Sequence, residues 1–227
     1  MIEEIGKDVA FDATEQAVCD RMQIERDSPV FERAMELLET VKRVMKPAYL
    51  LKEIAVDGSA DGASFGGQRF HSKIVGSKIA GRESVILYIA TCGPEIGAYL
   101  EAIEDPIDEY VVDKFCHMGY LSAMNALRAS LSATHGIDRH ITLAPGSIID
   151  WSVAEVKKFF VIADGLYQKI GVRVLESGLI DPLKSGSGVI VRSEEEFESC
   201  DICARIDCPS RRTPFSEEKY EAMINLQ

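Results

Sequence analysis

Three cysteines near the C-terminus are the residues whose type and spacing best suit chemistry. Cys200, Cys203 and Cys208 lie within nine residues, and Pro209 follows the last of them. Thiolates this close together can hold one zinc ion or an iron–sulfur cluster. Four residues rather than two separate the last pair, so three interpretations stay open: a metal or cluster site, a redox-active or reduced thiol group, and a cysteine-rich tail without a role. A fourth ligand could come from a histidine, an external group, Cys19, Cys92 or Cys116.

Two polar side chains share one face of an expected helix. Asp113 and His117 are four residues apart, so they lie side by side next to the apolar stripe of that helix. They could contact a ligand together, or they could form a solvated pair. Cys92 precedes a helix start at Pro94, where the positive helix end would favour a thiolate or attract an anion. A buried, unreactive thiol is the alternative for Cys92.

A run of serine and glycine residues offers backbone groups to a ligand. Around Ser185 and Ser187, the small residues Gly186 and Gly188 would allow backbone N–H groups to approach a bound molecule closely. A plain hairpin loop explains the same composition. Glu176 ends an expected strand and could accept a hydrogen bond from an amino group, or it could be an ordinary surface carboxylate.

Apolar periodicity and capping signals predict the elements that position these residues. Ser28 before Pro29 marks one helix start, and Ser152 with Glu155 forms a possible capping box for another. The turn-rich stretch 57–67 suits a hairpin or a mobile loop. We expect helices over 13–23, 29–45, 72–80, 105–136 and 152–162 and one from 94, and strands over 49–56, 84–90, 140–145, 172–176 and 189–191.

These elements predict one α+β unit without internal repeats, in which helices enclose a central, largely antiparallel sheet. We divide it into an N-terminal helical segment (1–48) packed on the main domain, an α+β core (49–195) and a cysteine-rich tail (196–227).

The composition excludes several classes of protein. The 25 basic and 37 acidic residues leave a formal charge of −12, which argues against binding duplex nucleic acid. No apolar run approaches the 18 residues of a membrane span, and the acidic N-terminus does not resemble a signal peptide. We therefore expect a cytoplasmic protein with reduced thiols.

Three ordered motifs resemble the activation domain of cobalamin-dependent methionine synthase. The run from Glu176-Ser177 through Pro182 to Ser185-Gly-Ser187-Gly188 resembles the pattern E-S-x-x-M-x-P-x-x-S-x-S-G of that family. Leu143-Ala144-Pro145-Gly146 lies where the family has an A-P-G-Y-P segment, and the long helix precedes it at the expected distance. The resemblance covers residues 85–192.

This resemblance implies a curved sheet flanked by helices, with S-adenosylmethionine bound in a shallow groove and presented to a corrinoid. The family has an arginine four residues before the glycine of A-P-G-Y-P, which clamps the carboxylate of the ligand. Here that position is Thr142, and Ser147 and Ile148 replace the following Tyr and Pro. The cofactor-binding residues that the resemblance implies are Glu176, Ser185, Ser187, Gly188, Ala144 and Gly146, with Asp113 and His117 on the helix that reaches the ligand.

The leading hypothesis is a free-standing activation-domain-like protein. It would support the reductive methylation of cobalamin on a methionine synthase that lacks this region, or on another corrinoid protein. The alternative is an iron–sulfur or zinc-binding electron-transfer or adaptor protein for a corrinoid methyltransferase, with Cys200, Cys203 and Cys208 as ligands. A third hypothesis is a docking module that binds a corrinoid protein without either ligand.

Overall fold

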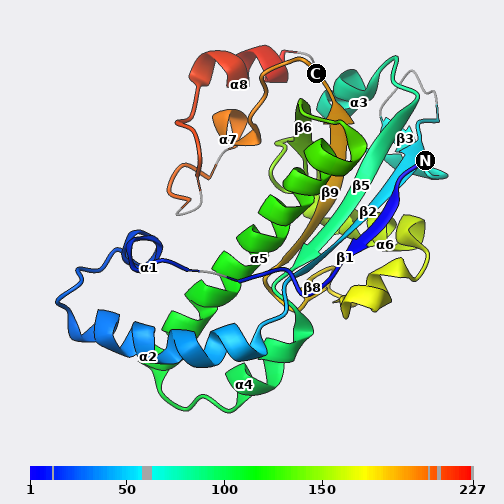
Figure 1. Ribbon diagram of the computed structural model, residues 1–227. Coiled ribbons are helices and arrows are strands. Elements are labelled where there is room, and N and C mark those ends of the chain that lie inside the picture. Colours follow the sequence, from blue (N-terminus) through cyan, green and yellow to red (C-terminus); the bar gives the residue numbers. More distant parts are fainter. Residues whose placement is uncertain (12, 58–62, 204, 209–210, 226–227) are drawn as a thin grey trace.

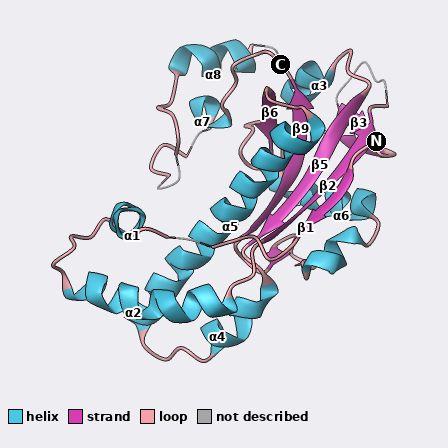
Figure 2. Cartoon of the chain, in the orientation of Figure 1, coloured by secondary structure: helices cyan, strands magenta, loops and turns pink. Residues whose placement is uncertain are grey.

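A five-stranded antiparallel sheet lies at the centre of the molecule (Figures 1 and 2). The computed structural model describes residues 1–11, 13–57, 63–203, 205–208 and 211–225. Each strand pairs with its neighbours in antiparallel register, which confirms the expected α+β class. The strands, in sheet order, are β1 (Glu3–Gly6), β2 (Ala48–Ala55), β5 (Ser84–Thr91), β9 (Ser185–Arg192) and β6 (His140–Leu143).

The long helix α5 (Pro106–His135) crosses one face of this sheet (Figure 2). Asp105 caps its N-terminus by accepting hydrogen bonds from the backbone N–H of Ile107 at 2.7 Å and of Asp108 at 3.2 Å. Gly136, at a φ of 63°, ends it in the left-handed conformation that glycine adopts without strain. The apolar residues between helix and sheet include Tyr88, Ile190, Met124, Leu127 and Leu131.

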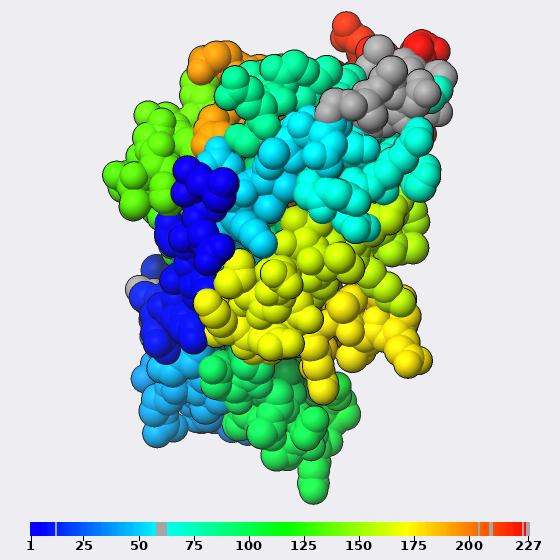
Figure 3. Space-filling view, turned by 90° about the vertical axis from the view of Figure 1, so that its right-hand side faces the viewer, coloured from blue at the N-terminus to red at the C-terminus, as the bar shows by residue number. Residues whose placement is uncertain are grey.

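The opposite face of the sheet carries α6 (Val156–Ala163) and the short elements around it. Figure 3 shows this segment in yellow, between the cyan region of β2 to β4 and the green region of α4. Its aromatic side chains join the inward residues of the strands in the largest core cluster, where Phe65, Phe70, Trp151 and Phe159 are fully buried.

A second core lies where α1 (Glu15–Met22) and α2 (Pro29–Val44) pack on the N-terminal half of α5 (Figure 1). Ser28 accepts a hydrogen bond from the N–H of Phe31 at 3.2 Å, with Pro29 at the first helical position, as the sequence predicts. We call the buried side chains at this contact between α1, α2 and α5 the N-terminal core cluster. It includes Val18, Leu38, Val41, Val111 and Phe115, together with Cys19, Cys92 and Cys116.

The remaining elements are short. The Gly66–Gly67 turn joins two strands into the expected hairpin, whereas residues 58–62 of the same stretch lie outside the described part of the chain. These elements are β3 (Ala63–Phe65), β4 (Gln68–Phe70), α3 (Lys73–Ile79), η1 (Pro94–Ile96), α4 (Gly97–Glu101), η2 (Val153–Glu155), η3 (Leu166–Ile170), β7 (Arg173–Val174), β8 (Ile180–Asp181), α7 (Ser199–Ile202) and α8 (Glu217–Ile224).

The structure corrects the sequence-based assignment in three places. Glu3–Gly6 form the edge strand β1, which pairs with β2 and whose Glu4 accepts hydrogen bonds from Tyr49 at 2.5 Å and from Ser130 at 2.7 Å. The Ser–Gly run is not a loop but the first half of β9, paired with β5. Glu155 does not complete a capping box, since its carboxylate binds the indole N–H of Trp151 and the ammonium of Lys158 instead.

Within the described residues, no helix combines the length and apolar character that crossing a membrane requires.

Candidate functional site

A cavity of about 370 Å³ lies where α1, α5, the start of β9 and the C-terminal tail meet. Each of these four segments contributes at least one charged side chain to its wall. We call it the cationic cavity, and its lining residues are Arg21, Asp113, Lys114, His117, Lys184, Arg205 and Cys208. It joins two predicted ligand contacts, Asp113 and His117, with one predicted metal ligand, Cys208.

The charged side chains of the cationic cavity hold one another in place. Lys184 forms an ion pair with Asp113 at 2.9 Å, and the ammonium of Lys114 lies 4.7 Å from the centre of the Tyr110 ring. Burial lowers the pKa of His117 to about 4, and the nearby charges of Arg21 and Lys184 act in the same direction. His117 is therefore neutral at pH 7, as expected for an imidazole surrounded by cations.

Gly186 and Gly188 of β9 lie close to tyrosine side chains on the face of the sheet that α5 covers. A β-carbon on Gly186 would lie 2.7 Å from the hydroxyl of Tyr120, and one on Gly188 would lie 2.3 Å from the backbone oxygen of Leu143. The protein itself thus requires small residues here, whether or not a ligand approaches.

The two serines of the run point to the opposite face, because side chains alternate along a strand. Ser185 donates a hydrogen bond to Thr91 at 2.8 Å. Ser187 is only 5% exposed, and its hydroxyl has no hydrogen-bond partner among the described residues. Ser187 pairs with Ile89, which belongs to the cluster on the α6 side.

Three further predicted contacts also lie away from the cationic cavity. Gly146 has a φ of 79° in a tight turn, and its N–H donates to the carbonyl of Trp151 at 2.8 Å. The Ala144 carbonyl accepts a hydrogen bond from the Ser147 hydroxyl at 2.7 Å. The side chain of Glu176 is exposed. The eight predicted cofactor contacts therefore fall into two groups, with only Asp113 and His117 at the cationic cavity.

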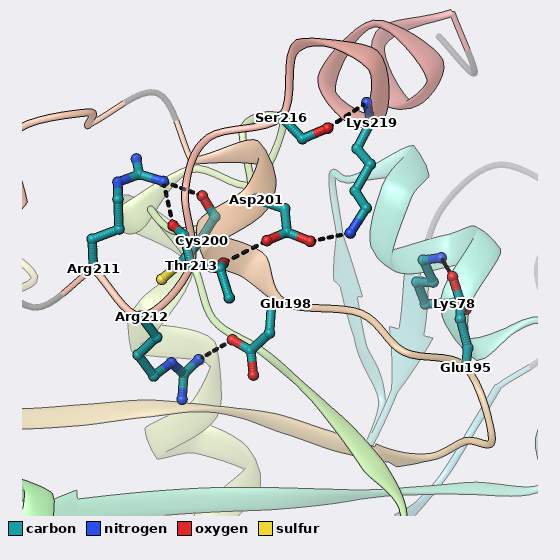
Figure 4. Close-up of polar contacts among 10 residues, drawn as sticks. All are labelled: Lys78, Glu195, Glu198, Cys200, Asp201, Arg211, Arg212, Thr213, Ser216 and Lys219. Atoms are coloured by element: carbon teal, nitrogen blue, oxygen red, sulfur yellow. Dashed lines mark hydrogen bonds and ion pairs between the residues drawn. The ribbon is translucent and has the colours of Figure 1, made fainter.

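One arginine organises the predicted metal-ligating loop of the tail (Figure 4). The Arg211 guanidinium donates to the backbone oxygens of Cys200 and, at 2.8 Å, of Cys203. It also donates to three other carbonyls, those of Arg205, Ile206 and Thr213. Because these carbonyls converge on one cation, the loop is fixed by its backbone rather than by its thiols.

The cysteines of the tail are half-buried, free thiols. Across the described ranges, no group of three or more His, Cys, Asp or Glu side chains is arranged to hold a metal ion. Pro209 lies outside the described residues. The metal or cluster at Cys200, Cys203 and Cys208 stays a prediction.

The cations Arg21, Lys114 and Lys184 were not expected at a site. They come from segments far apart in the chain, so no local spacing indicates that they meet. The one signal in the sequence is the matched helix face of Asp113 and His117, which does point into this cavity.

The comparisons with known proteins support the fold. No protein-family model matches the chain, and no curated protein matches it. Among solved structures, the chain is similar to a crystal structure of the MetH reactivation domain bound to AdoHcy. The TM-score is 0.61 at 12% sequence identity, and the likeness covers 98% of this chain and 89% of that chain. The chain therefore has the fold of that domain.

Proposed function

We propose that this protein binds S-adenosylmethionine and supports the reductive methylation of a corrinoid that another protein holds. The similarity to the AdoHcy-bound reactivation domain carries this proposal, because it extends over 98% of the chain rather than over one motif. The ordered motifs from Leu143 to Gly146 and from Glu176 to Gly188 support the same role. When bound, S-adenosylmethionine supplies the methyl group, and an external one-electron donor reduces the corrinoid.

In this chain, the carboxylate of such a ligand would bind at the cationic cavity and not at the position of the family's arginine. Thr142 cannot form the bidentate pair that arginine forms with a carboxylate. The cationic cavity, in contrast, carries Arg21, Lys184 and Arg205 within reach of His117 on the predicted ligand-facing side of α5. The protein's part is thus to bind and orient the ligand, while the reactive groups belong to ligand and corrinoid.

Three exposed apolar side chains adjoin lining residues of the cationic cavity, and they support docking by another protein. Leu183 and Ile206, next to the lining residues Lys184 and Arg205, are 67% and 63% exposed. Tyr110, beneath Lys114, is 46% exposed. Exposed apolar side chains around a polar cavity are typical of a surface that a partner covers.

Calorimetric titration of the full chain with AdoHcy and with S-adenosylmethionine tests ligand binding. We expect one site with an affinity of about 1–100 μM, because the arginine clamp is absent. A second experiment mixes the chain with a cob(II)alamin-loaded corrinoid protein, S-adenosylmethionine and a one-electron donor, and follows methylation by visible absorption. Omission of the chain is the control. Absence of binding heat at millimolar ligand, together with no rise in methylation, would contradict the proposal.

A further inference from the structure

The cationic cavity has a charge opposite to that of the molecule. Its wall carries four cations, Arg21, Lys114, Lys184 and Arg205, and one carboxylate, Asp113. The whole chain has 37 acidic and 25 basic residues, so a surface cavity formed by chance would be acidic on balance. Cations gathered from four segments of an acidic chain repel one another and favour a negative ligand between them.

Two of these four cations are held by identified neighbouring side chains. Asp113 is committed to Lys184 at 2.9 Å, and the Lys114 ammonium lies over the Tyr110 ring. His117 of the same wall adds no charge at pH 7, because burial first, and then the charges of Arg21 and Lys184, lower its pKa to about 4. A volume of about 370 Å³ accommodates a small-molecule fragment.

We propose that the cationic cavity binds the carboxylate or phosphate group of a small ligand, with Arg21, Lys184 and Arg205 as the cations that hold it. For the identity of the ligand, this inference rests on the proposed function, in which the anionic group is the carboxylate of S-adenosylmethionine. The anion-binding chemistry itself does not depend on that identity. The tail then has a direct role, because Arg205 closes the cavity from a segment beyond the sheet.

The test compares two cavity variants with a matched variant elsewhere. Arg205→Gln and Arg21→Gln each remove one charge from the cavity wall, whereas Arg43→Gln removes the same charge from the exposed surface of α2. The probes are AdoHcy and inorganic phosphate at fixed ionic strength, titrated by calorimetry into the full-length protein. The unfolding midpoint of each ligand-free variant separates a loss of binding from a loss of fold.

A charge-assisted contact predicts that each cavity variant weakens binding about ten- to a hundredfold, while Arg43→Gln leaves it unchanged. If AdoHcy binds in this way, both proposals are supported. If phosphate binds in this way and AdoHcy does not bind at all, the cavity is an anion site and the S-adenosylmethionine function is wrong. If AdoHcy binds equally well to all three variants, the proposed function stands, and the cavity is not the site of the ligand carboxylate; if phosphate binding is also equal in all three, this inference is overturned. Binding of neither probe overturns both.

The imidazole of His117 gives a second readout that does not depend on affinity. It is faced by Arg21 of α1, Asp113 and Lys114 of α5, Lys184 before β9, and the tail residues Arg205 and Cys208. An anion among these groups stabilises the imidazolium and raises the pKa of His117 by about one unit or more. Proton NMR titration with and without the probe measures this shift, and His117→Gln assigns the signal. A pKa that is unchanged at saturating probe would contradict the inference.

Discussion

Glu53 connects several strands through one carboxylate. It accepts hydrogen bonds from the Ile2 N–H at 3.0 Å and from Ser84 at 2.8 Å, and it forms an ion pair with Arg192 at 2.8 Å. Burial alone would raise the pKa of Glu53. The contacts with Ser84 and Arg192 outweigh that effect and lower the pKa to about 2.

Glu53→Gln should destabilise the protein in a pH-dependent way. A carboxyl whose pKa is lower in the folded state stabilises that state above its ordinary pKa near 4.5, and this contribution disappears as the pH falls from about 4.5 to about 2. At pH 7 we expect a loss of about 2 kcal/mol in the free energy of unfolding, measured by urea denaturation. The loss should vanish near pH 2. The exposed Glu3→Gln serves as the control, and an equal loss for both variants would contradict the assignment.

Ser187 is a residue whose hydroxyl the fold does not use. Because a buried, unpartnered hydroxyl costs free energy, Ser187→Ala should raise the free energy of unfolding of the ligand-free protein by about 1 kcal/mol. Urea denaturation measures this change. Ser72→Ala, which removes a buried hydroxyl that donates to Asp150 at 2.6 Å and caps α3 by accepting from the Val75 N–H, should have the opposite sign. A loss of stability in Ser187→Ala would show that its hydroxyl has a partner.

At the scale of elements, β9 passes closer to its neighbours than any larger residue would allow. In Gly188→Ala, the new methyl group would clash with the Leu143 backbone oxygen, which is fixed in β6. We expect a loss of about 3 kcal/mol in the free energy of unfolding, measured by thermal or urea denaturation. Gly97→Ala is the matched control, because α4 has open space there and alanine favours the helix. A neutral Gly188→Ala would mean that the two strands can separate.

The loop of the tail depends on the fork shape of one side chain. Arg211→Lys keeps the charge but cannot reach the carbonyls of both Cys200 and Cys203, so the loop should loosen. We expect these thiols to react with iodoacetamide about tenfold faster, as measured by mass spectrometry of the peptides. Arg212→Lys, whose parent side chain pairs with Glu198 at 2.7 Å, is the control. Equal rates in both variants would contradict the role of Arg211.

Elements with local signals could be predicted from the sequence, whereas those made by distant contacts could not. The cap at Ser28 and the long apolar repeat of α5 are local, and both predictions are confirmed. The strand β1 is acidic and has no apolar alternation from which it could be predicted. Its Glu4 instead contacts Tyr49 and Ser130, which are distant in the sequence. The candidate site follows the same division, since Asp113 and His117 share a helix face but Arg21 and Arg205 meet only after folding.

At the scale of the whole molecule, the cationic cavity depends on both ends of the chain. Arg21 comes from α1 and Arg205 from the tail, and α5 contributes Asp113, Lys114 and His117 to the same wall. A partner that covers this cavity must therefore contact N-terminal and C-terminal segments together. The apolar residues Leu183 and Ile206 are placed to be buried by such a partner.

Leu183→Gln and Ile206→Gln should weaken docking on the proposed corrinoid partner, and they add no charge beside the cationic cavity. Burial of an unpaired amide at the interface predicts a rise of about tenfold in the partner concentration needed for half-maximal methylation. Val161→Gln, at a residue 64% exposed on α6, is the control on the other face of the sheet. An equal effect from Val161→Gln would place the docking surface elsewhere.

The buried thiols of the N-terminal core cluster can report how often this part of the molecule opens. Cys92 and Cys116 are 1% exposed and Cys19 is 8% exposed, and a contact with Cys92, followed by burial, raises the pKa of the Cys116 thiol. Cys92 and Cys116 can react with a label only when this cluster opens. Their labelling rate under native conditions therefore measures the free energy of that opening. The half-buried tail cysteines react without it, so one protein sample carries both the probe and its reference.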